Sequence, residues 1–176
     1  MHIYVYRQAL DLNVKWPNDI YVNGEIKIGG LIVNSIIEAD SAICNIGLGV
    51  NLSNSIPTTC INDLIKEYNK KHSGNLKELS YEKTLAIIFN EIESILNRIQ
   101  DGDINHLYEL YYACWLHTDT SVKVLSQNGQ EKNGKILGID EYGFLKIRLD
   151  NNTIESVQPD GNSFDMLRGL IIPKAN

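Results

Sequence analysis

The chain has 176 residues, of which 43% are hydrophobic and 22% charged, and its net charge is −6 at pH 7. This composition is typical of globular protein, and the length allows one medium domain or a domain with a small module. The acidic balance argues against a protein that binds nucleic acid along its backbone, and no apolar run approaches the roughly 18 residues of a membrane span.

The first predicted element of clear type is a β-hairpin over residues 15–34. Residues 1–11 are short and apolar, and they are compatible with either an edge strand or a helix. The hairpin is predicted because two apolar runs flank Asn23-Gly24, the dipeptide that most readily adopts the two positive φ angles of a type I′ turn. Pro17 excludes a helix through this segment and suits the mouth of a strand.

The hairpin register follows from the length of its turn. With a two-residue turn, Lys27 would lie opposite Ile20, and Gly29 would lie opposite Asn18. Lys27 and Asn18 would then share one face, and Asp19 would point to the other face.

Lys27 is the first candidate for chemistry. Gly29 and Gly30 remove side chains just beyond it, so that a ligand can approach the backbone, and a lysine so placed can bind an anion. A solvated lysine on a half-buried strand is the competing interpretation, because lysines are mostly exposed.

A second strand is predicted over residues 42–52. Gly47 and Gly49 stand two apart, which leaves one strand face without side chains, and Asn51 offers an amide that can both donate and accept. This pattern is compatible with the seat of a flat heterocycle. A bend or a bulge in the strand explains the two glycines as well.

Three helices follow in the predicted order. The first covers about 61–72 and ends near Gly74, the second begins after the capping residue Ser80 and stops at Asp101-Gly102, and the third begins after Asp103. The second helix carries apolar residues at three- and four-residue steps, and we expect this stripe to be core: Leu85, Ile88, Phe89, Ile92, Ile95, Leu96 and Ile99. The aromatic stripe of the third helix is also expected to pack.

The pattern changes to short alternating runs after residue 117. Five short strands separated by turn residues in about 55 residues predict a small SH3-like barrel. The boundary is placed so that residues 1–118 form one domain and 119–176 the other. The cysteines are odd in number and widely spaced, the histidines have no partners at metal-ligand spacing, and no metal site is predicted. The start shows neither a signal nor a transit peptide, so we expect a cytoplasmic protein, with mitochondria left open.

Three stretches together resemble a known family. Lys15-Trp16-Pro17-Asn18-Asp19, Lys27-Ile28-Gly29-Gly30 and Gly47-Leu48-Gly49-Val50-Asn51 occur in the order and at about the spacings of the biotin–protein ligases. The run 57–64 resembles the animal holocarboxylase synthetases in particular. The resemblance implies an α+β fold: the C-terminal part of a class II synthetase-like mixed sheet with helices, followed by the SH3-like barrel.

The resemblance also implies an incomplete catalytic domain. Members carry, before the first motif, a Ser-Thr-Asn/Gln element and an Arg/Gly-rich loop that closes over biotin and the adenylate, whereas residues 1–11 alone precede the stretch that resembles the family here. We therefore expect the C-terminal half of such an enzyme, without the loop that closes over its ligands. We also expect an exposed apolar sheet edge where further strands belong.

The implied activity has two steps. Biotin and ATP, with Mg²⁺, give biotinyl-5′-AMP, and the biotin is then transferred to a lysine of the carrier domains of biotin-dependent carboxylases; nucleic acid other than ATP is not expected as a partner. The resemblance makes Lys27 the principal catalytic residue and Asp19 the group that orients it or holds Mg²⁺. The other implied roles are a second cation toward the phosphates at Lys15, nucleotide binding by Asn18 and Asn51, and close approach of the ligand at Gly29, Gly30, Gly47 and Gly49.

Two other interpretations remain open at this point. The chain resembles a lipoate or octanoyl transferase in core fold, although the Lys-Trp-Pro-Asn-Asp motif and the C-terminal barrel favour biotin. It could also be a non-catalytic module that docks carrier proteins or complements an N-terminal half.

Overall fold

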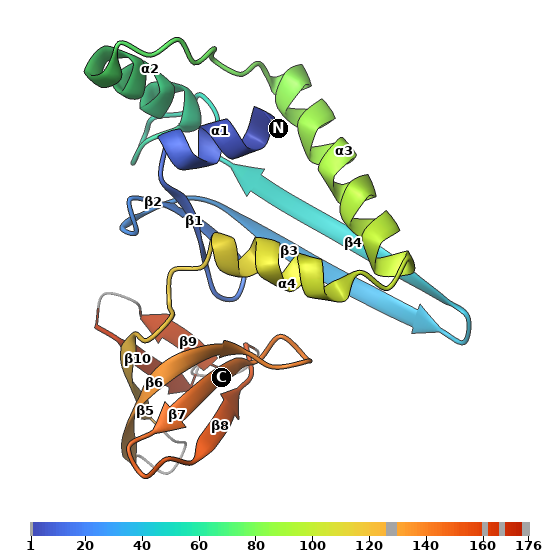
Figure 1. Cartoon of the computed structure of the whole chain (residues 1–176), viewed down its shortest axis with the longest axis vertical. Coiled ribbons are helices and arrows are strands. Elements are labelled where there is room, and N and C mark those ends of the chain that lie inside the picture. The colour runs from blue at the N-terminus through green and yellow to red at the C-terminus, as the bar shows by residue number, and fades with distance from the viewer. Residues whose placement is uncertain (1, 126–129, 160–161, 166–167, 174–176) are drawn as a thin grey trace. The chain divides into compact units, whose positions relative to one another are not determined.

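The computed structural model describes residues 2–125, 130–159, 162–165 and 168–173. The chain divides into two compact units, Met1–Leu116 and His117–Asn176, called here the first and second units, and each is described by itself. Among the described residues, no helix is long and apolar enough to cross a membrane. The mixture of helices and sheets confirms the α+β class (Figure 1).

The first unit combines one four-stranded sheet with helices. Its strands lie in the order β1-β2-β3-β4, and each neighbouring pair is antiparallel. The N-terminal segment, which the sequence left open as a strand or a helix, forms a helix. The elements of this unit are α1 (His2–Ala9), β1 (Leu12–Lys15), β2 (Asp19–Val22), β3 (Ile26–Glu38), β4 (Ser41–Val50), α2 (Ile61–His72), α3 (Tyr81–Gln100) and α4 (Ile104–Ala113).

The β2–β3 hairpin forms where the sequence predicts it, but with a different register. Asn23 and Gly24 have the expected positive φ angles of 52° and 70°, and the amide of Glu25 bonds the carbonyl of Val22 at 3.1 Å. Val22 nevertheless pairs with Ile26, so three residues separate the paired positions. The predicted pairs of Lys27 with Ile20 and of Gly29 with Asn18 are therefore wrong.

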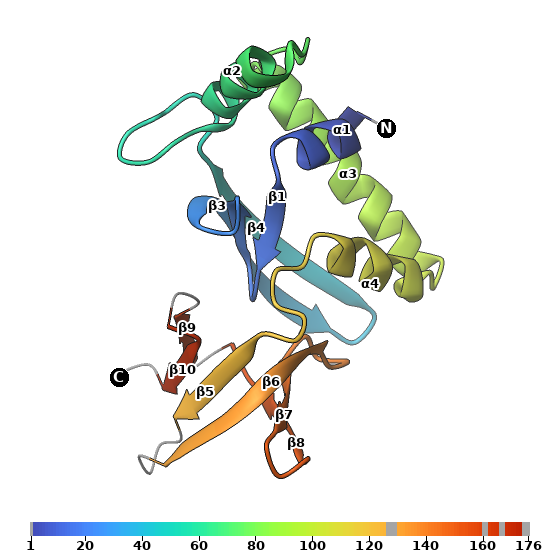
Figure 2. The ribbon, with the colours of Figure 1, turned by 60° about the vertical axis from the view of Figure 1, so that its left-hand side comes forward.

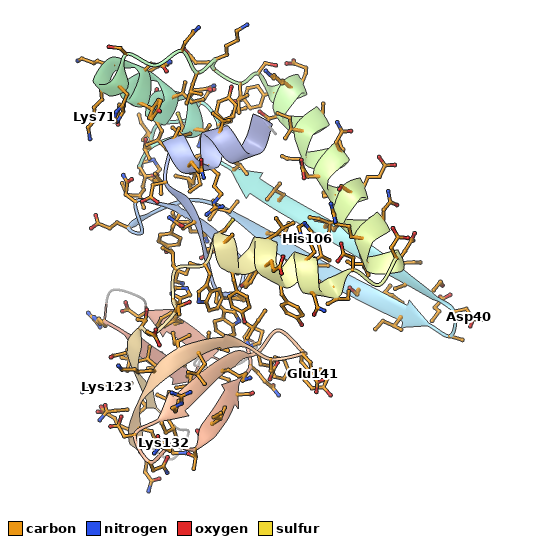
Figure 3. All side chains as sticks on the ribbon, in the orientation of Figure 1. Asp40, Lys71, His106, Lys123, Lys132 and Glu141 are labelled. Atoms are coloured by element: carbon orange, nitrogen blue, oxygen red, sulfur yellow. The ribbon has the colours of Figure 1, made fainter. Side chains whose placement is uncertain are left out.

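A long hairpin, β3–β4, extends from the end of the sheet that carries the sequence motifs to a turn at residues 39–40. Figure 3 labels Asp40 at this turn, and Figure 2 shows the hairpin from a second side. β4 is one of the two edge strands of the sheet order, and the hairpin beyond the glycines exposes many of its apolar side chains. The exposed residues are Ile32, Val33, Ile36, Ile37, Ile43, Ile46 and Leu48.

The helices form as predicted, but the apolar stripe of α3 is not core. The hydroxyl of Ser80 accepts a bond from the amide of Lys83, which is the expected cap. No residue of α3 is buried, and Phe89 is 65% exposed. α3 runs beside the β4 side of the hairpin, across an apolar groove of about 490 Å³ that includes Leu48 and Leu85. Periodicity identified the apolar face correctly, but the described chain covers it only in part.

The buried side chains of the first unit lie at the other end of the sheet. Trp16 and Val22 are 2% and 1% exposed, and Ile28 is 1% exposed on the bulged part of β3. Ile65 of α2 and Cys60 before it are fully buried. This core packs against β1, β2 and the first residues of β3. These strands carry the first two sequence motifs.

The second unit is a six-stranded sheet in the order β8-β7-β6-β5-β10-β9, with β10 parallel to β5 and the other pairs antiparallel. Alternating residues of β5 and β7 are buried, and Ile136, Ile147 and Ile171 have no exposed surface. The sheet therefore encloses its own core. It has one strand more than predicted: β5 (Ser121–Leu125), β6 (Glu131–Ile139), β7 (Leu145–Leu149), β8 (Ile154–Val157), β9 (Asn162–Asp165) and β10 (Leu170–Pro173).

Candidate functional site

A β-bulge organises the candidate site. Asp19 pairs with Gly30, but Tyr21 pairs with Lys27, so β3 has one extra residue between these pairs and Ile28 is the residue without a partner. A bulge of one residue moves the following side chains to the other face of the strand. Asp19, Tyr21, Lys27 and Gly30 therefore share one face, and the expectation that Asp19 faces away from Lys27 is wrong.

Lys27 and Asp19 form an ion pair on this face. The ammonium of Lys27 lies 2.6 Å from Oδ1 of Asp19, with the lysine side chain 53% exposed and the carboxylate side chain 19% exposed. Gly30 makes room for the pair, because a Cβ there would lie 3.0 Å from Asp19 Oδ1 and 3.6 Å from Lys27 Cε. The carboxylate thus holds a partly exposed ammonium above bare backbone.

A cavity of about 930 Å³ lies along this part of β3 and β4, and it includes both members of the ion pair. Gly30 pairs with Gly49, and Gly47 pairs with Ile32, so these three glycines lie on the Lys27 side of the sheet. No atom lies within 4 Å of a Cβ built at Gly49. A flat ligand can lie directly against this backbone.

Gly29 serves a different purpose from the other three glycines. It pairs with Ile20 and Val50, on the opposite face of the sheet. A Cβ there would lie 2.7 Å from the carbonyl oxygen of Gly49 and 3.4 Å from the side chains of both partners. Gly29 is required for close packing of the sheet, although its backbone also borders the cavity.

Asn18 fastens the turn between β1 and β2 to the third strand. Its side-chain amide donates to the carbonyl of Leu31 at 2.6 Å, and its own carbonyl accepts from the amide of Leu31 at 2.9 Å. The donor of the side chain is therefore engaged in the fold, while Asn18 as a whole borders the cavity.

Asn51 and the following loop form another side of the cavity. The side chain of Asn51 donates to the carbonyl of Thr59 at 3.3 Å and accepts from Asn54 at 2.9 Å. Ser55 donates to the carboxylate of Asp63, and this bond lowers the pKa of Asp63. Asn51 thus shapes the loop that brings residues 57 and 58 to the cavity.

Lys15 lies on the same face as the ion pair, because it pairs with Asp19 across β1 and β2. It does not border the cavity among the described residues; its ammonium stands 5.8 Å from the centre of the Tyr21 ring. Sequence reasoning missed Tyr21, since an aromatic residue in a strand usually indicates packing. The available signal was that Tyr21 follows Asp19 by two positions, which places both side chains on the same face of the strand.

The arrangement can bind an anion beside a flat group. Lys27 supplies a cation held at a fixed place, and the bare strands supply a surface without side chains. No group of three or more His, Cys, Asp or Glu residues that could hold a metal ion occurs in the described ranges. The ion pair and the bare strands suit the site to an anionic, largely planar ligand.

Two family models match the chain in separate segments. The Biotin/lipoate A/B protein ligase family matches residues 5–51, which contain the bulged hairpin and the glycine-bearing strand. The Biotin protein ligase C terminal domain matches residues 119–169, which form most of the second unit.

Curated relatives are similar along nearly the whole chain. The "Biotin--protein ligase" of Homo sapiens is 44% identical over 167 residues, covering 95% of this chain and 23% of that protein. "Biotin--protein ligase 1, chloroplastic" of Arabidopsis thaliana is 34% identical over 92% of this chain and 44% of its own length. The chain thus spans less than half the length of these relatives.

Among solved structures, the biotin protein ligase of Leishmania major in complex with biotinyl-5-AMP aligns with a TM-score of 0.45 at 20% identity, covering 90% of this chain and 60% of that one. The two family models and the identity to the human and plant ligases show that the chain belongs to the biotin–protein ligase family.

Proposed function

We propose that this chain carries the adenylate-forming part of a biotin–protein ligase, which makes biotinyl-5′-AMP from biotin and ATP and transfers biotin to a lysine of carboxylase carrier domains. The observation that carries the proposal is the bulged hairpin, which places the Lys27 ammonium on the glycine-bare face next to a carboxylate. As part of this proposal, residues 1–118 belong to the catalytic domain and residues 119–176 to the C-terminal domain.

In the first step, a carboxylate oxygen of biotin attacks the α-phosphorus of ATP, and the bond to pyrophosphate breaks. Two anions must approach each other, and negative charge grows around the α-phosphate. The ammonium of Lys27 would bind a carboxyl oxygen of biotin and an α-phosphate oxygen together, because fixed cations stabilise such transition states. Asp19 would hold the ammonium in position until both substrates are bound.

In the second step, the amine of a carrier lysine attacks the carbonyl carbon of the mixed anhydride, an amide forms, and AMP leaves. Lys27 would stabilise the charge that develops on the phosphate as AMP departs. The glycine-bare backbone would hold the planar parts of the intermediate close to the strands.

The remaining candidate residues would have supporting roles. Lys15 would add a second cation toward the phosphates. Asn18 and Asn51 would act through the turn and the loop they fasten, with any contact to nucleotide made through the part of each amide that the fold leaves open. Mg²⁺ commonly binds phosphates with one or two protein carboxylates, and Asp19 is the carboxylate among the described residues that border the cavity.

Pyrophosphate exchange tests the proposal. In a full-length version, Lys27→Ala should abolish biotin-dependent exchange between pyrophosphate and ATP while the fold stays intact. The matched control is Lys70→Ala, at an exposed lysine in the last turn of α2, which should retain full exchange. Near-normal exchange by Lys27→Ala would defeat the assignment.

A second candidate function is favoured by the exposed apolar surfaces of the hairpin and α3. A fragment that complements another polypeptide would carry such surfaces, and the chain alone would then bind neither substrate. Calorimetry of the 176-residue chain with biotin and with ATP separates the two functions, because a self-sufficient ligase binds both and a complementing fragment binds neither.

A further inference from the structure

The face that carries Lys27 contains a regular arrangement of side chains on three strands. Across β1, β2 and β3, one row of paired residues is Asn13, Tyr21 and Lys27. The next row is Lys15, Asp19 and Gly30. Each lysine on an outer strand therefore lies diagonal to a residue of the central strand β2.

Both lysines contact their diagonal neighbours. The ammonium of Lys27 lies 2.6 Å from the Asp19 carboxylate, and the ammonium of Lys15 lies 5.8 Å from the centre of the Tyr21 ring. The second distance is within the roughly 6 Å over which an ammonium is attracted to the face of an aromatic ring. Strand β2 thus holds one lysine by a charge and the other by a ring.

The two contacts differ in their effect on the positive charge. The Asp19 carboxylate offsets much of the charge of Lys27 until a stronger anion replaces it. The Tyr21 ring carries no net charge, so it holds the Lys15 ammonium in place without neutralising it. Partial burial and the nearby Asp19 carboxylate raise the pKa of Tyr21, which keeps the phenol neutral at physiological pH.

We propose that Tyr21 is a positioning residue whose ring seats the Lys15 ammonium as the second phosphate-binding cation of the site. This inference rests on the proposed function for its ligand, ATP. It assigns a role to the ring of Tyr21 rather than to its hydroxyl, and it explains why a tyrosine stands on the strand between the two lysines.

The seat can be observed without any substrate. The lysines of the 176-residue chain are labelled by reductive ¹³C-methylation, and the Lys15 signal is assigned by its loss in Lys15→Arg. We expect the Lys15 methyl signal to be shifted upfield by the ring in the unsubstituted chain and in Tyr21→Phe, and to join the other lysine signals in Tyr21→Leu. An unshifted Lys15 signal in the unsubstituted chain would overturn the proposal, even if Tyr21→Leu does not fold.

The role in binding is measured by calorimetry with ATP on the same variants. Tyr21→Leu should weaken ATP binding by about two- to five-fold, Tyr21→Phe should bind normally, and biotin affinity should stay unchanged in both. In a Lys15→Gln background, Tyr21→Leu should cause no further loss, because the ring acts through that lysine. Equal losses in both backgrounds, or a loss in Tyr21→Phe, would overturn the positioning role.

The two measurements also separate this inference from the proposed function. If the unsubstituted chain binds no ATP, the proposed function of the isolated chain fails, and the methyl signal of Lys15 alone decides whether the seat exists. If ATP binds but the Lys15 signal is unshifted, the proposed function stands and the role of Tyr21 is wrong.

Discussion

The two units of the chain differ in how completely they bury their apolar residues. The second unit buries alternate residues of its strands, and Ile136, Ile147 and Ile171 are fully enclosed. Among its described residues, the first unit has buried side chains near α1, α2 and the end of its sheet that carries the candidate site. Its longest hairpin and its longest helix expose their apolar faces, with Ile37 82% exposed.

This difference shows that strands and helices can form in a unit without their apolar faces being buried in a core. The second unit has the features of an independently stable sheet. The first unit has well-defined strands and helices whose apolar faces stay exposed, and exposed apolar patches of this kind usually mark an interaction surface. The catalytic lysine proposed here lies at the end of the hairpin that is packed.

The largest expected effect is a loss of stability when a buried isoleucine of the second unit is replaced, compared with an exposed isoleucine of the first. Ile147→Ala should lower the free energy of unfolding of the second unit by about 2–5 kcal/mol, because it leaves a cavity in a closed core. The measurement is urea unfolding followed by the amide NMR signals of β7, since the two units need not unfold together.

The matched control is Ile37→Ala, which changes the free energy of unfolding by no more than about 0.5 kcal/mol, since this side chain is mostly in solvent. A large loss in Ile37→Ala would show that the hairpin is covered in solution. The contrast between the units would then disappear.

A smaller effect distinguishes two glycines within the packed end of the hairpin. Gly29→Ala should destabilise the first unit by about 1–3 kcal/mol, because its Cβ would lie 2.7 Å from a backbone oxygen. Gly49→Ala has open space and should leave the unfolding midpoint unchanged, yet it should weaken ligand binding by placing a methyl group in the cavity. Thermal unfolding and calorimetry with ATP would test both, and equal midpoints for the two variants would contradict the packing role of Gly29.

The smallest expected effect concerns the aromatic residues of α4. Burial raises the pKa of Tyr111 to about 12, with a further contribution from Tyr112. An unfolded tyrosine ionises near 10, so above that pH the unfolded state loses a proton that the folded state keeps. The stabilising contribution is therefore complete below about pH 10 and is lost as the pH rises toward 12.

Urea unfolding from about pH 9 to about pH 11 measures this loss, and Tyr111→Phe should flatten the decline. An unchanged slope in Tyr111→Phe would mean that Tyr111 is exposed in solution, like the stripe of α3. The packed part of the first unit would then be smaller than described.

Local signals in the sequence predicted much of the fold. The cap at Ser80 and the positive φ angles at Asn23 and Gly24 occur as predicted, because each depends on neighbouring residues only. The burial of the α3 stripe could not be predicted, since periodicity shows which face is apolar but not what covers it. The sixth strand of the second unit was missed because its shortest strands have too few residues for a clear alternation.

The candidate site was predicted in part for the same reason. The resemblance singled out Lys27 and Asp19, but the geometry that joins them depends on pairing between strands. Counting residues from a two-residue turn placed Asp19 on the wrong face, and a bulge leaves no distinctive residue in the sequence. Tyr21 was overlooked because its contact with Lys15 depends on the pairing of β1 with β2.

The unpaired residue at Ile28 lets Lys27 and Gly30, three positions apart, share one face of β3. If the same residues paired regularly, Lys27 would share its face with Gly29, and Gly30 would turn to the other side; exchanging Ile28 for valine would leave the bulge in place. The bulge therefore decides which of two adjacent glycines forms the bare surface beside the amine.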